Sequence, residues 1–306
     1  MNKVVVLLST YNGANYLEQL LDSILNQSDV DVEIRVRDDG SNDGTRSILK
    51  NYSKQHKNII VKYGQNEGWR KSFFDLMFSV SPEDRVFYAF ADQDDVWMRD
   101  KLSTAVSMIK NADMPMLYHS NLTIVNKELE ELKPMYPMNM NPSTKNPEAY
   151  FEGIGVGATM VMNNKLLSLI QKHKPQLEIT HDAYVIELSN ILGCTVYDKQ
   201  SHILYRRHEE NATGYGKNAN QATPTLLDRY KKYKKAPKNG FSERAEELLK
   251  GYQNILDEKN KEILLKIANY RNNLWYKIEL LFNPKMKAST VRKSLQMKFR
   301  VINNTL

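Results

Sequence analysis

Cysteine and long apolar runs are almost absent from this chain of 306 residues. Its one cysteine, Cys194, excludes a disulfide within the chain and agrees with a reducing compartment. No run of 18 or more apolar residues occurs, so the sequence predicts no helix that spans a membrane. The apolar run at 4–8 is too short for the core of a signal peptide. We therefore expect a cytoplasmic protein.

Acidic residues are missing from the C-terminal end of the chain. Residues 284–306 contain six basic residues and no acidic one, and the formal net charge of the whole chain is +7. A hydrophobic content of 41% and a charged content of 26% indicate a globular protein. The basic end favours partners rich in phosphate, namely nucleic acid, an anionic membrane or a phosphorylated substrate.

The chain is organised around an apolar, aromatic run at 87–97 that contains three carboxylates, Asp92, Asp94 and Asp95. This pattern predicts a buried strand that ends at the ligand-binding edge of an open α/β sheet. Asp92 and Asp94 are two residues apart, so they would share a face and would repel each other without a cation. Carboxylate oxygens suit Mg²⁺ or Mn²⁺. The alternative is an acidic turn in which Asp95 caps a helix at 96–109.

Apolar runs alternate with polar turns and helical patterns through the first hundred residues. This alternation predicts strands at 3–10, 32–36, 59–63 and 85–91. Four strand–turn–helix units indicate a doubly wound, largely parallel sheet. The pattern then predicts short strands at 116–119, 122–125, 195–197 and 202–205, helices at 164–173 and 182–192, a polar connection at 128–133 and a mobile loop at 135–147.

Five short motifs follow one another in an order that resembles family 2 glycosyltransferases. The motifs are STYNG at 9–13, DDGSNDGT at 38–45, NEG at 66–68, DQDD at 92–95 and HD at 181–182. The resemblance implies the GT-A fold and an inverting enzyme that uses a metal ion and a sugar nucleotide.

A sixth segment, YRRHEEN at 205–211, is similar to the bacterial branch that includes rhamnosyltransferases of cell-surface polysaccharides. The match spans roughly residues 3–214. Two positions depart from it: Arg207 stands where the branch usually has a glutamine, and Asn121 stands where relatives often carry an aspartate.

We expect an α/β architecture with two parts. The first is a GT-A catalytic domain at 1–218, with a doubly wound, mostly parallel (mixed) sheet and helices on both faces. The second is a basic helical extension at 219–306, where the pattern becomes helical and basic from residue 225 onward.

The resemblance also implies a set of residues that bind the nucleotide sugar. Asp39 would accept the imide N–H of uracil or thymine, and its alternative is an Asx-turn carboxylate that bonds its own backbone. Tyr11 would contact the base, or would only pack. Arg206 would pair with phosphate oxygens. The full set is Thr10, Tyr11, Asn12, Asp39, Asn66, Gly68, Lys71, Asp92 and Arg206.

Three further residues are implied to carry the chemistry. Asp94 and His208 would hold Mg²⁺ or Mn²⁺ beside the two phosphates. Asp182 would act as the general base that deprotonates the acceptor hydroxyl. Its alternative is a simple N-cap at the start of a helix, a common place for aspartate.

We therefore expect a hexosyltransferase that moves a sugar, with rhamnose the leading candidate, from a dTDP- or UDP-sugar to a cell-surface polysaccharide or lipid-linked glycan. A nucleotidyltransferase is one alternative, but such enzymes usually open with a glycine- and arginine-rich loop, unlike STYNG at 9–13. A nucleic-acid-binding protein is another, but the basic end has neither a stacking motif nor zinc-ligand spacing.

The basic end also contains an amphipathic pattern. Val291, Leu295, Phe299 and Ile302 are spaced by four, four and three residues, so on a helix they form one apolar stripe. A basic amphipathic helix lies in the membrane interface, which would make the protein peripheral on the inner face of the membrane. The alternative is that the stripe packs on the catalytic domain.

Overall fold

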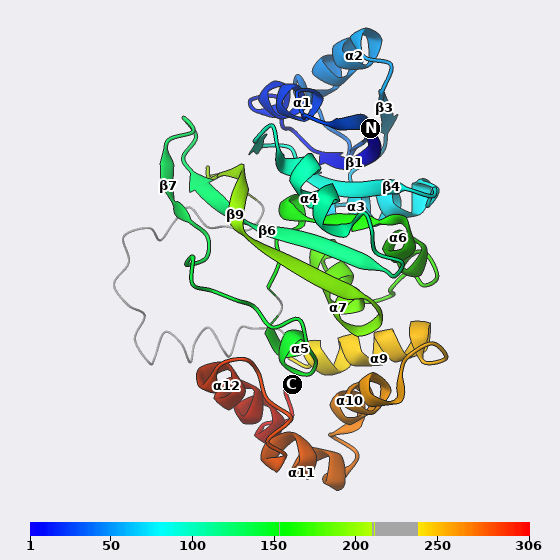
Figure 1. Cartoon of the computed structure of the whole chain (residues 1–306), viewed down its shortest axis with the longest axis vertical. Coiled ribbons are helices and arrows are strands. Elements are labelled where there is room, and N and C mark those ends of the chain that lie inside the picture. Colours follow the sequence, from blue (N-terminus) through cyan, green and yellow to red (C-terminus); the bar gives the residue numbers. More distant parts are fainter. Residues whose placement is uncertain (153, 210, 212–237) are drawn as a thin grey trace.

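The fold is built on one mixed β-sheet (Figure 1). The computed structural model describes residues 1–152, 154–209, 211 and 238–306. In this part of the chain nine strands form one sheet in the order β3-β2-β1-β4-β8-β6-β9-β5, and β7 pairs with β6. The strands are β1 (Asn2–Thr10), β2 (Val30–Asp38), β3 (Ile59–Tyr63), β4 (Val86–Asp92), β5 (Val96–Trp97), β6 (Met116–Val125), β7 (Glu131–Pro134), β8 (Val161–Asn163) and β9 (Cys194–Arg206).

The first four strands are parallel, as the sequence predicts. β1 pairs in parallel with β2 and β4, and β3 pairs in parallel with β2. Helices follow these strands in turn: α1 (Leu17–Leu25), α2 (Thr45–Gln55), α3 (Trp69–Ser79) and, beyond β5, α4 (Lys101–Ile109). Because parallel strands end at the same edge of a sheet, the turns after β1, β2 and β4 meet at one place.

Helices cover both faces of this sheet, which confirms the predicted layers. Alternate residues of a strand point to opposite faces, and β1 is buried on both. Val4 and Val6 join a core with α1, α2 and α4. Val5 and Leu7 join a second core with α3, α6 (Asn164–Ile170) and α7 (His181–Leu192).

The second half of the sheet differs from the prediction in its strand lengths. The two short strands expected at 116–119 and 122–125 are one strand, β6, and those expected at 195–197 and 202–205 are one strand, β9. β6 and β9 pair in parallel along their length. The register of this pairing shifts around Asn121, where the polar residues in the middle of the strands lie. The connection expected at 128–133 contains the exposed edge strand β7.

The helix expected at 96–109 begins later, at Lys101. Val96 and Trp97 instead pair with β9 as the short strand β5. Asp95 is therefore not a helix cap. Its carboxylate is fully buried and accepts the backbone N–H of Arg206 at 3.0 Å, which ties the acidic turn to the end of β9.

Four helices complete the chain beneath the sheet (Figure 1). They are α9 (Gly240–Tyr252), α10 (Glu258–Asn269), α11 (Leu274–Phe282) and α12 (Val291–Ile302), and a short helix, α5 (Glu148–Glu152), contacts α7 and α12. Leu248, Ile267 and Val301 are buried in the same core as α7. The helical C-terminal region is thus confirmed, while the predicted domain boundary at 218/219 lies outside the described residues. No helix in the described part is long and apolar enough to cross a membrane.

Candidate active site

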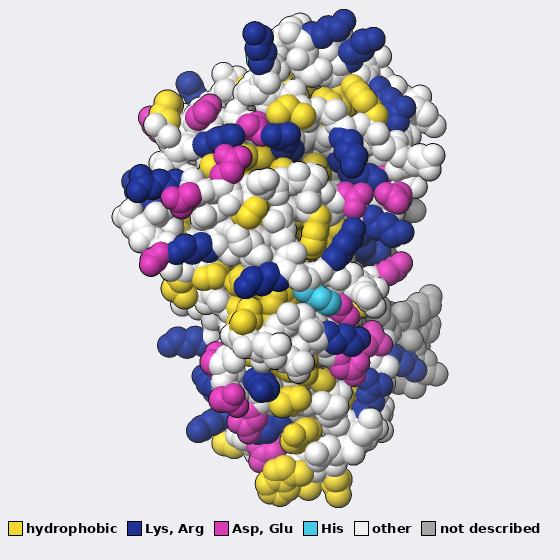
Figure 2. Space-filling model, turned by 90° about the vertical axis from the view of Figure 1, so that its right-hand side faces the viewer, with side chains coloured by type: hydrophobic (Ala, Val, Ile, Leu, Met, Phe, Trp, Pro, Cys, Tyr) yellow, Lys and Arg dark blue, Asp and Glu magenta, His cyan; other side chains and the backbone are white. Residues whose placement is uncertain are grey.

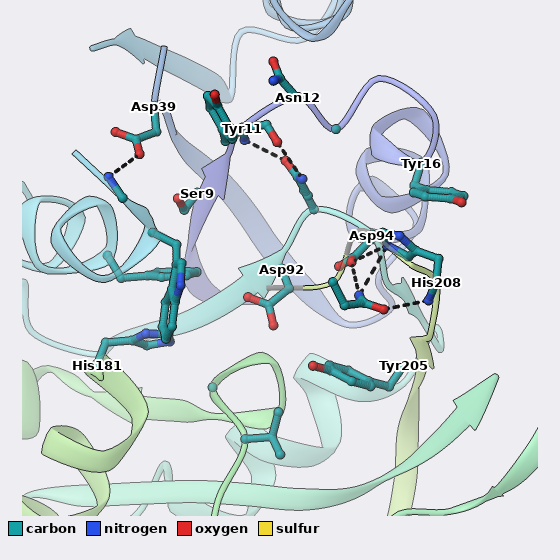
Figure 3. Close-up of a pocket in the computed structure, with 18 of the residues that line it drawn as sticks. Ser9, Tyr11, Asn12, Tyr16, Asp39, Asp92, Asp94, His181, Tyr205 and His208 are labelled. Atoms are coloured by element: carbon teal, nitrogen blue, oxygen red, sulfur yellow. Dashed lines mark hydrogen bonds and ion pairs between the residues drawn. The ribbon is translucent and has the colours of Figure 1, made fainter. Parts of the chain in front are cut away.

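A pocket of about 800 Å³ lies at the carboxyl ends of the parallel strands (Figure 3). Tyr11 and Asn12 reach it from the turn after β1, Asp39 from the turn after β2, and Asp92 and Asp94 from the end of β4. The opposite wall comes from the first turn of α7 and the end of β9. The topology therefore gathers residues from remote parts of the chain at one edge of the sheet, where this class of fold binds ligands.

Asp94 and His208 meet inside this pocket although they are 114 residues apart. Oδ2 of Asp94 lies 2.8 Å from Nε2 of His208, and it also accepts the side-chain N–H of Asn211 at 2.7 Å. Neighbouring ligand atoms around Mg²⁺ are roughly 3 Å apart, given metal–oxygen distances near 2.1 Å. The spacing of these two atoms therefore fits a divalent cation.

Among the described residues, no group of three or more His, Cys, Asp or Glu side chains could hold a metal. Mg²⁺ is usually held by one or two protein groups, and water and substrate phosphates complete its shell. Nδ1 of His208 is buried without a partner in the described part of the chain.

Asp92 lines the same pocket, and burial and neighbouring charges shift the pKa of its carboxylate. The pKa of Asp92 is raised to about 7, chiefly by burial and then by the carboxylates of Asp94 and Asp182, while the charge of Arg207 acts to lower it. Asp92, Asp94 and Asp182 thus lie close enough to influence one another, and Arg207 lines the same pocket. A bound cation would favour the ionised form of each carboxylate.

Asp39 connects the end of β2 to the start of α3. Its carboxylate is buried and accepts the backbone N–H groups of Glu67 at 3.0 Å and Gly68 at 2.8 Å. The guanidinium of Arg37 donates to the same carboxylate. The predicted alternative, a bond to its own turn, is therefore not the bonding observed. Asp39, Asn66 and Gly68 all line the pocket.

Three of the predicted donor-binding residues do not line the pocket. Thr10 is buried and its hydroxyl donates to Asp38 at 3.3 Å, and Lys71 is exposed on α3. Arg206 is 2% exposed: it donates to the carbonyl of Asp94 at 2.8 Å, to Gln19 on α1 and to the carbonyl of Lys127. Its donors are occupied by the protein itself, so in this structure Arg206 supports the turn that carries Asp94 instead of reaching a phosphate.

Asp182 lies in the first turn of α7 and lines the pocket. The N-cap of that helix is Thr180, whose hydroxyl accepts the backbone N–H of Ala183. Asp182 shares this task, because its Oδ1 accepts the same N–H at 2.8 Å and the hydroxyl of Thr180. Among the described residues no hydrogen bond reaches Oδ2, which leaves one carboxylate oxygen for a substrate.

The pocket also contains residues that the sequence did not single out as ligands. Arg207 lines it where Arg206 does not. Gln93 bonds both backbone groups of Tyr11, at 2.8 and 2.9 Å, and so holds the turn after β1. His181 stacks on Phe73 with ring centroids 3.9 Å apart, and burial lowers its pKa to about 4. Of these three residues, only Arg207 departs from the pattern of the rhamnosyltransferase branch, and this departure drew attention to its position in the sequence.

Comparison with known proteins identifies the family of this chain. Residues 5–168, more than half of the chain, match the family described as glycosyl transferase family 2. The chain belongs to this family. The predicted glycosyltransferase activity is thereby confirmed, and the nucleotidyltransferase and nucleic-acid-binding alternatives are set aside.

Relatives of this family 2 glycosyltransferase include bacterial glycosyltransferases. The dTDP-rhamnosyl transferase RfbG of Shigella flexneri is 27% identical over 220 residues, which cover 68% of this chain and 73% of that protein. A putative teichuronic acid biosynthesis glycosyltransferase of Bacillus subtilis, TuaG, is 36% identical over 100 residues, 32% of this chain and 38% of that protein.

A solved structure confirms the GT-A fold. TarS 1-349 of S. aureus, crystallised in complex with UDP-GlcNAc, superposes with a TM-score of 0.59 at 17% identity. The superposition covers 99% of this chain and 80% of that chain, so it includes the C-terminal helices.

Proposed function

We propose that this enzyme transfers a sugar from a pyrimidine nucleoside diphosphate to a hydroxyl of a cell-surface or lipid-linked glycan, with inversion of the anomeric centre. The observation that carries the proposal is the convergence of Asp39, the Asp94–His208 pair and Asp182 on one pocket. The relative named as a dTDP-rhamnosyl transferase favours dTDP-rhamnose as the donor, ahead of UDP-sugars.

The donor would lie along the edge formed by β1, β2 and β4. Asp39 keeps acceptor capacity on Oδ2, which has one backbone partner, and can receive the imide N–H of uracil or thymine. Tyr11 is 44% exposed beside it and can cover the base. Asn12, Asn66 and Gly68 offer polar groups along the same wall, and Asp92 can contact the ribose hydroxyls.

The diphosphate would sit beside Asp94 and His208, which we propose as ligands of Mg²⁺ or Mn²⁺. When bound, such a cation neutralises negative charge that develops on the leaving diphosphate. Arg207, which lines the pocket near Asp92, can add a second positive charge there. Arg206 would act indirectly, by holding the backbone of Asp94.

The proton of the acceptor hydroxyl would pass to Asp182. As it leaves, the acceptor oxygen bonds to the anomeric carbon, and the nucleoside diphosphate departs with the electrons of the broken bond. Because one displacement occurs from the face opposite the leaving group, the anomeric centre inverts. A carboxylate suffices as base because the proton moves late, when the sugar carbon is already cation-like.

A donor screen tests this proposal. The full-length enzyme would be incubated with Mn²⁺, a bacterial lipid-linked glycan fraction and dTDP-rhamnose, UDP-glucose, UDP-GlcNAc or GDP-mannose, and products would be identified by mass. We expect a mass increase of one sugar with a dTDP- or UDP-linked donor. Transfer only from GDP-mannose would overturn the pyrimidine assignment and leave the family intact.

A further inference from the structure

α11 exposes an unusual number of large apolar side chains. Leu274 is 75% exposed, Trp275 64%, Ile278 37% and Phe282 75%. Their spacing places them on one side of the helix, and on the other side Leu280 is fully buried in the core.

α12 carries a second exposed stripe. Val291 is 79% exposed, Leu295 62%, Phe299 49% and Ile302 60%. The helix packs on the protein through Met297 and Val301 instead, which are buried. In the part of the chain that the structure describes, this stripe is not packed on the catalytic domain, which was the alternative considered from the sequence.

The two helices that carry these stripes lie at the end of the molecule opposite α1 and α2 (Figure 1). α11 and α12 contact each other, and hydrophobic side chains gather at the lower end of the face shown in Figure 2, where α11 lies. Eight of the seventeen exposed large apolar side chains in the described part of the chain belong to these two helices of 9 and 12 residues. We call these eight side chains the apolar tip.

The segment that contains α12 is basic, and Figure 2 shows both basic and acidic side chains near the lower end of the molecule. The six basic residues of 284–306 stand without an acidic neighbour in that segment. Lys287 and Lys293 reach Glu148 and Glu152 at 3.5 Å. Lys285, Arg292 and Lys298 form no ion pair with any described residue, so their charge is available to a partner.

We propose that the apolar tip docks the enzyme on an anionic lipid bilayer. Apolar side chains flanked by lysine and arginine are the composition of surfaces that lie in the headgroup region. A second copy of the chain fits less well, because a two-fold axis through the tip would place the basic rims of both copies against each other. The inference concerns a surface away from the pocket and does not depend on the donor.

Point variants test this better than truncation. Met297 and Val301 are core residues, and the backbone N–H of Leu306 bonds the hydroxyl of buried Tyr270 at 3.0 Å, so removing the C-terminal end would open the core. Trp275→Ser with Leu295→Ser removes apolar contacts at exposed positions. Arg292→Gln with Lys298→Gln removes charge and keeps the stripes.

A matched control removes exposed apolar side chains elsewhere. Leu132 is 60% exposed on β7 and Ile60 is 39% exposed on β3, so Leu132→Ser with Ile60→Ser changes apolar exposure outside the tip. Flotation would be measured with the full chain on vesicles of equal parts phosphatidylglycerol and phosphatidylcholine, and on vesicles of phosphatidylcholine alone. UDP or dTDP binding of each variant would be measured beside it.

We expect the wild type and the control to float with anionic vesicles and not with neutral ones. The charge variant should bind them roughly tenfold or more weakly, since each basic residue near an anionic surface adds about 1 kcal/mol, and the tip variant should stay in solution. Nucleotide binding should be equal in all four proteins, which separates this proposal from the donor assignment. Flotation of the tip variant like the wild type, or no flotation of the wild type, would overturn the proposal. A wild-type dimer in sedimentation that the tip variant abolishes, without flotation, would assign the surface to a second copy.

Discussion

Among single residues, Arg207 lines the pocket, whereas Arg206 holds the backbone of Asp94 from behind it. Neighbouring residues at the end of a strand point to opposite sides. Only one of Arg206 and Arg207 can therefore face the pocket, and the structure gives that place to Arg207. The motifs indicated this region but could not decide between the two arginines, because the choice depends on which side of the chain at the end of β9 faces the pocket.

Asp182→Asn should separate binding from chemistry. The amide keeps the size of the side chain and can still accept the N–H of Ala183, so α7 should start as before. We expect the affinity for the donor to stay within about twofold and turnover to fall by roughly a hundredfold or more, because general-base catalysis contributes that much. Donor affinity by calorimetry and initial rates would be compared. Equal turnover in the two proteins would leave Asp182 with only a structural role in the first turn.

Arg206→Lys should weaken the proposed metal site, although Arg206 itself does not line the pocket. Lysine keeps the charge but cannot reach Asp94, Gln19 and Lys127 together. We expect a loss of about 2 kcal/mol in unfolding free energy and a roughly tenfold weaker affinity for Mn²⁺. Arg207→Gln is the control, and should keep the affinity for Mn²⁺ while turnover falls. If Arg206→Lys kept the affinity for Mn²⁺ and lost turnover, while Arg207→Gln lost the affinity for Mn²⁺, Arg206 would be the arginine that binds phosphate.

At the scale of elements, strand–helix units with apolar strands were predictable, and polar strands were not. β1 to β4 are apolar runs bounded by polar turns, so their pattern identifies them. β6 and β9 contain polar residues in their middle, such as Ser120 and Asn121, which looked like breaks. The burial of these residues comes from the pairing of the two strands, which are 70 or more residues apart and share no local signal.

β6 carries a buried histidine that should make stability depend on pH. His119 is 1% exposed, and burial lowers its pKa from 6.5 to about 4. In the unfolded chain the imidazole gains a proton below pH 6.5, whereas the folded chain resists until about pH 4, so stability falls as the pH falls through this window. The full contribution is on the order of 3 kcal/mol.

Replacement of this histidine checks the cause. His119→Gln should lose less stability than the wild type when denaturant unfolding is compared at pH 6.5 and pH 4.5. His56→Gln at the end of α2, where the side chain is partly exposed, should behave like the wild type. Identical pH dependence of His119→Gln and the wild type would show that other groups control acid unfolding.

At the scale of the whole molecule, the pocket and the apolar tip occupy different regions of one structure. α9 to α12 share a buried core with α7, whose first turn carries Asp182. The helices that would rest on the bilayer are thus connected through this core to the element that would deprotonate the acceptor. This arrangement suits an acceptor attached to a lipid.

The order of the motifs predicted the family and the GT-A fold, and it predicted most of the residues that meet in the pocket, because turns after parallel strands must converge. The apolar tip was only half predictable. The stripe on α12 is visible from spacing, but its exposure depends on which side of the helix the core covers.

We infer that the pocket binds a pyrimidine nucleoside diphosphate together with a metal ion. The direct test is to measure the binding of UDP, dTDP and GDP by calorimetry. Each would be titrated into the wild type and Asp94→Ala, with Mn²⁺ and with EDTA; Asp84→Ala, at an exposed position before β4, is the control. We predict that UDP or dTDP binds the wild type and the control at least tenfold more tightly with Mn²⁺, that GDP binds weakly, and that Asp94→Ala shows no gain from Mn²⁺. Tighter binding of GDP than of both pyrimidine nucleotides, or wild-type affinity unchanged by EDTA, would contradict the account.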